Sequence, residues 1–569
     1  MYAICISMQN AYSFIEVFPD DNMAKESYTS IRVTKNVRDE LQNYVEECYS
    51  DLSINSMLKV HLDNLSEGHV RFPKYGMFEC PKSRKEKMRK SIKGSPSKKS
   101  GSSLSLTGSL PSDPYTRTES DTMGPMEVPE SALWGASTQR AVLNFPISGF
   151  RMSRSFIRAL GYIKAGAATA NFELGVIDEE MKAAIVEAAL QVADGEFDDH
   201  FPVDVFQTGS GTSTNMNANE VIANISSKSF GSKIHPNDHV NQGQSSNDVI
   251  PSALHLSALL EIEEELCPSL LNLQRILEKK AEEFMPIIKT GRTHLMDATP
   301  IRLGQEFIGF AGLIERSLDR LLLVKDELSL LALGGTAVGT GVNTHPQFSA
   351  LACQNISKFS GVDVYETDNH FMAQSSLDGA LTASAVIRGL AVSMQKIASD
   401  IRWLGSGPRA GLGEIALPAV QPGSSIMPGK VNPVIPESVI QASSQVVACD
   451  TALVQGAQGG YFELNTMMPF AAHNLLQAIS LMTSSSEVFS SKCIEGLTAT
   501  DRGPELLMSG LMLATTLAPV IGYGKAAKIA KEAHASGQTI MEAALEKTDL
   551  SEDELREILN PEKMLQPQA

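Results

Sequence analysis

The residues best suited to chemistry lie in one segment, residues 421–433, which reads QPGSSIMPGKVNP. Glycine and proline interrupt helices and strands, so this segment is predicted to be a loop. It carries two neighbouring hydroxyls, an ammonium and an amide, at Ser424, Ser425, Lys430 and Asn432. Polar groups on a loop between rigid elements are typical of catalytic sites. We therefore expect a functional site at this loop.

Three further polar segments could supply partners for it. Residues 207–219 read QTGSGTSTNMNAN, residues 235–248 read HPNDHVNQGQSSND, and residues 291–300 read GRTHLMDATP. Serine, threonine and asparagine at this density favour loops and helix N-caps. Hydroxyls, amides, one lysine and helix N-termini can bind carboxylates without a metal ion. The combined set suits a small dianionic substrate.

Other chemistries fit the sequence poorly. The glycine strings at residues 209–211 and 335–341 precede no Lys-Ser or Lys-Thr pair and follow no convincing strand, which argues against a nucleotide site. His235, His239 and His294 lack the HExxH spacing and have no nearby cysteine set. We therefore expect neither a metal ion nor a cofactor.

Composition limits the partners and the location. A net charge of −18 and a pI near 5.2 argue against nucleic-acid or membrane binding by the whole chain. The seven cysteines are scattered without a CxxC pair, which is typical of reduced thiols in a cytoplasmic protein. No apolar run approaches the ~20 residues that span a bilayer. The first residues show no basic leader, so we expect no targeting peptide.

The first part of the chain differs from the rest. Residues 1–78 form a small appended segment in which an alternating stretch near Ile31 precedes two helical patterns, near residues 37–45 and 54–62. This order weakly resembles a ribbon-helix-helix DNA-binding module, and a small helical appendage or a spurious upstream extension is the alternative. Residues 79–114 are basic and rich in serine and lysine, which predicts a disordered linker.

The elements that must position the polar segments are predicted to be helices. Residues 115–250 form an N-terminal domain, residues 251–500 a central bundle of long helices, and residues 501–569 a small helical domain. The clearest helix, at residues 377–404, repeats apolar residues every seven positions at Ala380, Ile387, Met394 and Ile401, with small residues between them. Pro300 and Pro436 suit first turns of further helices, with Thr299 as a cap for the former.

The polar segments carry a family resemblance. Residues 421–433 resemble the signature loop of the fumarase/aspartase superfamily. The motifs GRTHLMDATP, SSND, HPND and SGT match the same superfamily, as does EVPESALWGASTQRAVLNFPISG at residues 127–149. The similarity runs from about residue 115 to the C-terminus and is greatest to the class II fumarate hydratases. It implies a mainly α fold, a long-helix bundle, and hydration of fumarate to malate in the tricarboxylic acid cycle.

An aspartate ammonia-lyase is the alternative within the superfamily. Those enzymes usually carry other residues at the positions of Ser210, Ser246, His294 and Gly429, where this chain has the fumarase residue. Residues 213–219 and His239 look more like an ammonia-lyase. A DNA-binding regulatory fusion through residues 1–78 is a further alternative, separable by its affinity for DNA.

The resemblance also implies roles for single residues. Ser424 takes the carbon-bound proton, His294 handles the water or hydroxyl, and Glu437 orients His294. Lys430 and Asn432 stabilise the doubly charged carboxylate of the intermediate, which is the main demand of the reaction.

The remaining implied positions concern binding and assembly. The substrate-binding set is Ser210, Gly211, Thr212, Ser245, Ser246, Asn247, Thr293, Ser425, Lys430, Val431 and Asn432. A second dicarboxylate site, for which a plain helix-capping turn is the equal alternative, is His235, Pro236, Asn237 and Asp238. The resemblance further implies a homotetramer in which each active site is built from three subunits.

Overall fold

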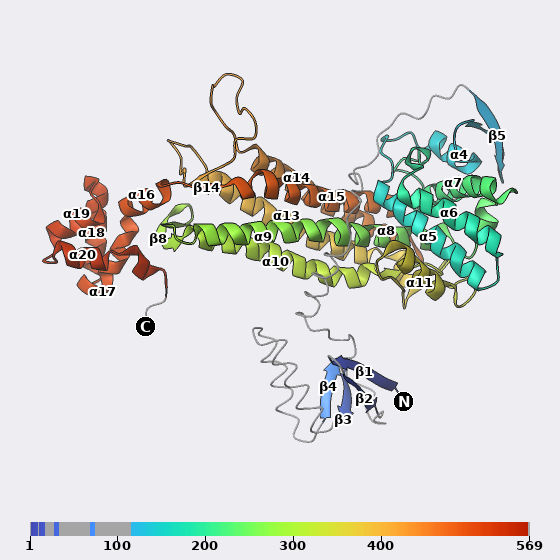
Figure 1. The fold of residues 1–569 in the computed structure, drawn as a ribbon, viewed down its shortest axis with the longest axis horizontal. Coiled ribbons are helices and arrows are strands. Elements are labelled where there is room, and N and C mark those ends of the chain that lie inside the picture. The colour runs from blue at the N-terminus through green and yellow to red at the C-terminus, as the bar shows by residue number, and fades with distance from the viewer. Residues whose placement is uncertain (1, 9–10, 18–27, 33–68, 74–114, 567–569) are drawn as a thin grey trace. The chain divides into compact units, whose positions relative to one another are not determined.

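The computed structural model describes residues 2–8, 11–17, 28–32, 69–73 and 115–566 (Figure 1). The chain divides into two compact units, Met1–Lys98 and Lys99–Ala569. In the first unit, β1 (Tyr2–Met8) pairs with β2 (Ala11–Val17). Strand β3 (Tyr28–Arg32), which holds Ile31, pairs antiparallel with β4 (His69–Pro73) of the same chain. The helical patterns predicted near residues 37–45 and 54–62, and the linker at residues 79–114, lie outside the described residues.

The second unit begins with a helical domain introduced by the hairpin of β5 (Thr116–Asp121) and β6 (Gly124–Pro129). Its helices are α4 (Ala136–Asn144), α5 (Arg154–Glu173), α6 (Glu179–Asp194) and α7 (Thr212–Phe230), followed by the short π-helical turn η2 (Pro236–Val240). Helix α5 starts at the N-cap Ser153 and is buried along most of its alanine-rich length. Small side chains let α6, α8 (Ser246–Glu261) and α11 (Phe348–Ser360) pack closely around it.

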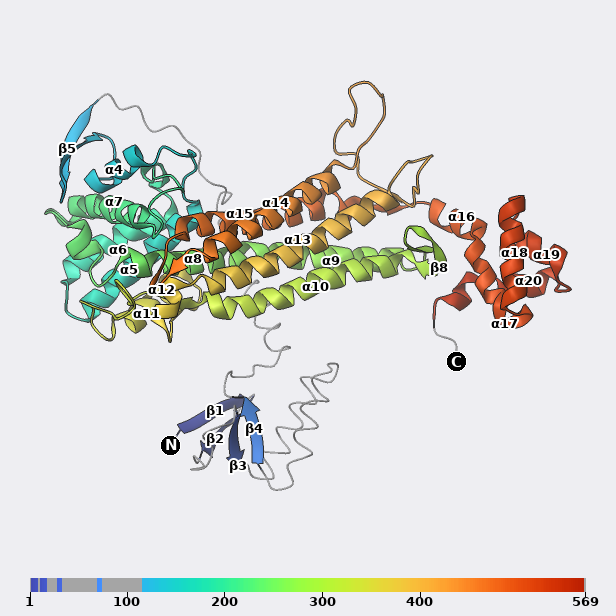
Figure 2. The ribbon, with the colours of Figure 1, turned by 180° about the vertical axis from the view of Figure 1, so that it is seen from behind.

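The long helices form a bundle, as Figures 1 and 2 both show. Its members are α8 (Ser246–Glu261), η3 (Ile262–Leu266), α9 (Cys267–Phe284), α10 (Leu303–Leu328), α13 (Asp378–Leu404), α14 (Val434–Ala457) and α15 (Met468–Lys492). Helix α9 packs on α10, α10 on α13, α13 on α14, α14 on α15, and α15 on both α8 and α9. The predicted mainly helical fold is therefore confirmed.

The sequence pattern of α13 explains its place in the bundle. Ala380, Ile387, Met394 and Ile401 are each 0% exposed, and the small residues between them, Ser384 among them, are also buried. The heptad seam therefore faces α10 and α14, as the spacing predicted. Helix α14 begins at Val434, which puts Pro436 in its first turn as expected.

The prediction for Pro300 was wrong. Instead of starting a helix, Pro300 lies in β8 (Met296–Arg302), which pairs antiparallel with β7 (Ile288–Thr293). Helix α10 starts only at Leu303, where the backbone N–H of Arg302 donates to the Gln305 side chain. A proline is tolerated there because this two-stranded hairpin leaves one edge of each strand without a ladder partner.

Shorter elements complete the second unit. They are β9 (Leu330–Leu331), α11 (Phe348–Ser360), β10 (Tyr365–Glu366), α12 (His370–Ser375), β11 (Ile415–Ala416), β12 (Gly460–Tyr461), β13 (Leu464–Asn465), η4 (Ile494–Gly496) and β14 (Thr498–Ala499). A small domain with its own apolar core follows, made of α16 (Arg502–Ser509), η5 (Leu511–Leu517), α17 (Ala518–Ile521), α18 (Tyr523–Ser536), α19 (Ile540–Lys547), α20 (Glu552–Ile558) and η6 (Pro561–Met564).

Candidate active site

Two helix N-termini meet at the first group of predicted site residues. The Ser210 and Thr212 hydroxyls lie 2.8 Å apart, and the Thr212 hydroxyl lies 2.8 Å from that of Ser246. Gly211 precedes α7 with φ +71, and a Cβ at this position would lie 2.8 Å from Ile250 of α8. Glycine therefore permits both the left-handed turn and the close approach of the helices. Three hydroxyls at two positive helix ends form a cradle suited to a carboxylate.

Asp248 holds this cradle in place and was missed by the sequence prediction. Its buried carboxylate accepts the backbone N–H of Ser245, Gly334 and Thr336, each at 2.9 Å. Burial raises the pKa of Asp248, and these donors partly offset that rise. Asn247 adds a bond from Nδ2 to the Ala337 carbonyl at 2.8 Å. The signal was available, because a serine N-cap with an acid three residues later is a capping box.

The loop that carries Ser424 leaves the bundle between β11 and α14 (Figure 1). Its neck is closed by the Gly423 N–H, which donates to the Lys430 carbonyl at 2.9 Å, and by Asn432 Nδ2, which donates to the Gly423 carbonyl at 2.6 Å. Ser424 Oγ accepts the N–H of Met427 at 3.0 Å and that of Ile426 at 3.3 Å. The loop thus aims backbone dipoles at one hydroxyl oxygen.

Several predicted groups on this loop face solvent in the single chain. Ser425, Lys430 and Val431 are exposed, and Ser424 and Asn432 are partly buried. Their polar atoms are therefore open to a ligand or to another protein surface.

His294 and Glu437 do not meet within one chain. His294 is exposed at the tip of the β7–β8 hairpin, where it and Leu295 have φ values of 57° and 61°. The adjacent Thr293 is exposed as well. Glu437 lies in the first turn of α14, and its Oε1 is 3.9 Å from the Arg402 guanidinium of α13. The predicted pairing of Glu437 with His294 stays a prediction about an assembled site.

The hydroxyl cradle and the His294 hairpin lie at opposite ends of the bundle. Helix α8, η3 and α9 follow one another without a break, with 16, 5 and 18 residues. At 1.5 Å per residue they span roughly 58 Å between the cradle at Ser246 and the start of the hairpin. The Ser424 loop leaves the bundle near the hairpin end in both views (Figures 1 and 2). One chain therefore cannot bring all predicted residues onto one small molecule.

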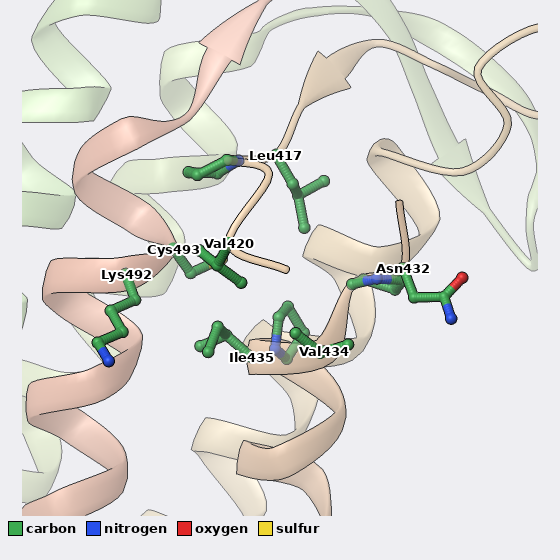
Figure 3. Close-up of a pocket in the computed structure, with 10 residues that line it drawn as sticks. Leu417, Val420, Asn432, Val434, Ile435, Lys492 and Cys493 are labelled. Carbon is green, nitrogen blue, oxygen red and sulfur yellow. The ribbon is translucent and has the colours of Figure 1, made fainter. Parts of the chain in front are cut away.

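A cavity beside the neck of the loop does not provide a substrate site either. Figure 3 shows it between Leu417 and Val420, the start of α14 near Ile435, and Lys492 and Cys493 at the end of α15. Its volume is about 10 Å³, which holds no more than one water molecule. A four-carbon diacid is too large for this cavity.

Buried charges anchor the hairpin that carries His294. Lys289 Nζ lies 3.0 Å from Glu306 Oε1 and 3.0 Å from Glu414 Oε2. Arg292 Nη2 lies 2.7 Å from Glu414 Oε1, and the Glu414 side chain is 1% exposed. Burial raises the pKa of Glu306, and Lys289 opposes that rise. Sequence inspection missed this network because Glu414 is distant in sequence from the hairpin.

The second predicted site has the geometry of a capping turn. His235 caps η2, and its Nδ1 lies 3.2 Å from the Asp238 N–H and 3.1 Å from the Asp238 carboxylate. The first contact requires a neutral ring nitrogen and the second a protonated one. The side chains of His235 and Asp238 are 42% and 75% exposed. Pro236 and Asn237 form the first turn of η2, so a capping role and ligand binding can coexist.

Within the described ranges, no group of three or more His, Cys, Asp or Glu side chains could hold a metal ion. Across the same residues, no single helix is long and apolar enough to span a membrane, although the bent pair of residues 502–509 and 511–521 passes that test jointly.

Known proteins resemble both the sequence and the fold. The family model described as "Lyase" matches residues 124–448, and the one described as "Fumarase C C-terminus" matches residues 513–566. The class II fumarate hydratase of Halobacterium salinarum is 52% identical over 454 residues, covering 79% of this chain and 97% of that protein. A class II fumarate hydratase 2 of Pseudomonas aeruginosa is 49% identical over 450 residues, covering 79% of this chain and 98% of that protein.

Solved structures agree with these relatives. The class II fumarase of Schistosoma mansoni superposes with a TM-score of 0.77 at 37% identity, covering 79% of this chain and 99% of that one. A fumarate lyase:delta crystallin of Brucella melitensis gives a TM-score of 0.76 at 43% identity, covering 80% and 100%. From these matches and from the shared sequence motifs, the chain belongs to the class II fumarate hydratases of the fumarase/aspartase superfamily.

Proposed function

We propose that this protein is a fumarate hydratase, which adds water to fumarate in the anti sense to give (S)-malate in the tricarboxylic acid cycle. The observation that carries the proposal is the Ser210, Thr212 and Ser246 cradle at two helix N-termini, in a chain whose relatives are named fumarate hydratases. Hydroxyl donors at positive helix ends bind one carboxylate of a small dicarboxylate. Ser245, Asn247 and Thr293 are assigned to the same binding set.

The difficult step is removal of a proton next to a carboxylate that already carries a negative charge. We assign this step to Ser424, because the Ile426 and Met427 N–H groups already point at its oxygen and favour its charged form. Lys430 and Asn432 lie on the same loop and are assigned to the second charge that gathers on the intermediate. The Asn432 side chain is already held by the Gly423 carbonyl of the same loop.

His294 is assigned to the oxygen chemistry. As an exposed imidazole on the β7–β8 hairpin, it can exchange a proton with the attacking water or the leaving hydroxide. In this proposal Glu437 orients the ring from a neighbouring subunit, since within one chain Glu437 faces Arg402.

We further propose a cytoplasmic homotetramer with each active site built from three subunits. The roughly 58 Å between the cradle and the His294 hairpin of one chain supports this assembly, because the groups can meet only between copies. Cys267, Cys353, Cys449 and Cys493 are free thiols, which fits a reducing compartment.

One absorbance assay tests the activity. Fumarate absorbance should grow when the purified protein receives malate and should stay flat when it receives aspartate. Growth from aspartate alone would instead make the protein an ammonia-lyase. Growth from neither substrate would overturn both assignments.

A further inference from the structure

Lys164 of α5 is a buried lysine for which the proposed mechanism has no use. Its side chain is 0% exposed, and its Nζ donates to Asn215 Oδ1 at 2.9 Å, Asn241 Oδ1 at 2.9 Å and Gln244 Oε1 at 3.0 Å. All three acceptors are neutral amides that lie 51 to 80 residues away in the sequence. A buried ammonium is costly, so such a constellation needs a reason.

The amides around Lys164 cannot turn their nitrogens toward it, because those nitrogens are already in use. Asn215 Nδ2 donates to Asn241 Oδ1 at 3.2 Å, and Asn241 Nδ2 donates to the Gln244 carbonyl at 3.1 Å. Gln244 Nε2 donates to the carbonyls of Val240 and Gln242. Three oxygens therefore face the lysine, and only the ammonium form has three N–H groups to match them.

Two of the three amide residues are close neighbours in sequence of the residues that form the carboxylate cradle. Asn215 lies three residues after Thr212 on α7, so the two are one helical turn apart. Gln244 immediately precedes Ser245, the N-cap of α8. Lys164 thus fastens the starts of the two helices whose hydroxyls form the cradle.

Among the residues that the structure describes, the charge of Lys164 has no direct counterion. Asp248 of α8 is the charged group that acts on Lys164. The Asp248 carboxylate accepts hydrogen bonds from backbone N–H groups and makes none with Lys164. The contacts from α7 and from residues 241–244 are neutral. Part of the positive potential of Lys164 therefore remains available to stabilise a dianion bound at the cradle.

We propose that Lys164 is a positioning residue of the dicarboxylate site, which as a buried ammonium locks the ends of α7 and α8 together and strengthens the binding of dicarboxylates there. This role rests on the proposed function. Burial lowers the pKa of Lys164 to about 7, and Asp248 opposes the shift. Proton loss above that pH removes both the charge and the third donor, so dicarboxylate affinity falls as the pH rises.

The test is calorimetric titration of the full-length protein with succinate, a dicarboxylate that does not react, between pH 6 and pH 9. The parent should bind more weakly as the pH rises through 7. Lys164→Met should bind roughly tenfold or more weakly at pH 6 and lose that pH dependence. Lys228→Met, which removes an exposed charge from α7 of the same domain, should behave as the parent.

A second variant keeps the test decisive if Lys164→Met fails to fold. Asn241→Asp places a carboxylate against Lys164 and should move the midpoint of the fall upward by roughly one unit or more. An unchanged midpoint, or a Lys164→Met protein with the affinity and pH profile of the parent, would overturn the role of Lys164. The malate assay on the parent decides the proposed function separately, and a parent that neither binds succinate nor releases fumarate overturns both.

Discussion

Ser424 shows how a weak base can be prepared by its own loop. A free serine hydroxyl holds its proton too tightly to act as a base at neutral pH. Here two backbone N–H groups within the next three residues already donate to its oxygen. Donors that are fixed before the reaction cost nothing to reorganise when charge develops.

Replacing Ser424 should therefore remove turnover while leaving binding. We expect Ser424→Ala to lower kcat roughly 10²–10⁴-fold, because a positioned proton acceptor is lost. The affinity for succinate should change little, since the cradle is intact. Ser438→Ala, an exposed serine on α14, is the control and should keep the parent kcat. A variant at Ser424 with parent kcat would remove the serine from the mechanism.

Cys267, Cys353 and Cys493 should be unreactive in the native protein. Burial raises the pKa of Cys267, Cys353 and Cys493 to about 12. Because pH 8 lies far below this pKa, the three groups stay as thiols, which alkylate slowly. Iodoacetamide followed by peptide mass spectrometry should find these three unlabelled in the folded protein and labelled in denaturant. Rapid native labelling at any of them would contradict the packing.

At the scale of elements, the shape of the Ser424 loop depends on how closely its entering and leaving segments approach each other at Gly423. A Cβ there would lie 2.5 Å from the Lys430 carbonyl oxygen and 2.7 Å from the Asn432 nitrogen. Gly423→Ala should force the neck apart, displace Lys430 and Asn432, and lower kcat/KM at least tenfold with little change in melting temperature. The matched control is Gly524→Ala on α18, where a Cβ meets nothing within 4 Å and activity should persist.

The buried network beneath the β7–β8 hairpin should matter for stability. Glu414→Ala leaves Lys289 without one carboxylate and Arg292 without its partner. Breaking a buried ion pair on one side costs roughly 3–5 kcal/mol of unfolding free energy. Urea unfolding at fixed protein concentration measures this loss. Glu552→Ala, which breaks an exposed pair with Arg556, should unfold close to the parent midpoint.

At the scale of the whole molecule, the two ends of the bundle can be tested apart. Ser246→Ala damages the cradle and Ser424→Ala damages the loop, so each variant alone should be almost inactive. If each site draws these residues from different copies, random mixing should restore roughly a quarter of the sites. Denaturing the two together and refolding them should recover that share of activity. No recovery, with mixed assemblies shown by mass, would refute shared sites.

Local sequence patterns predicted much of this architecture. The seven-residue spacing predicted α13 and its buried face, and glycine and proline located the loop. The hairpin was not predicted because His294 and Leu295 adopt left-handed backbone angles, which neither residue type indicates in a sequence. The Lys164 and Glu414 contacts join residues far apart in the chain, which no periodicity reveals. The predicted pairing of Glu437 with His294 is not made within the single chain, where Glu437 lies beside Arg402, so it stays a prediction.

The uninterrupted run from α8 through α9 sets the distance and the rotation between the two ends of the bundle. Deleting one residue within it would turn everything beyond by about 100° and draw it in by about 1.5 Å. Both the hairpin and the packed faces would then lose their registration at once. The turn at residues 174–178 between α5 and α6, in which no residue is buried, carries no such constraint. Length changes accumulated over evolution should therefore collect in the turns and spare residues 246–284.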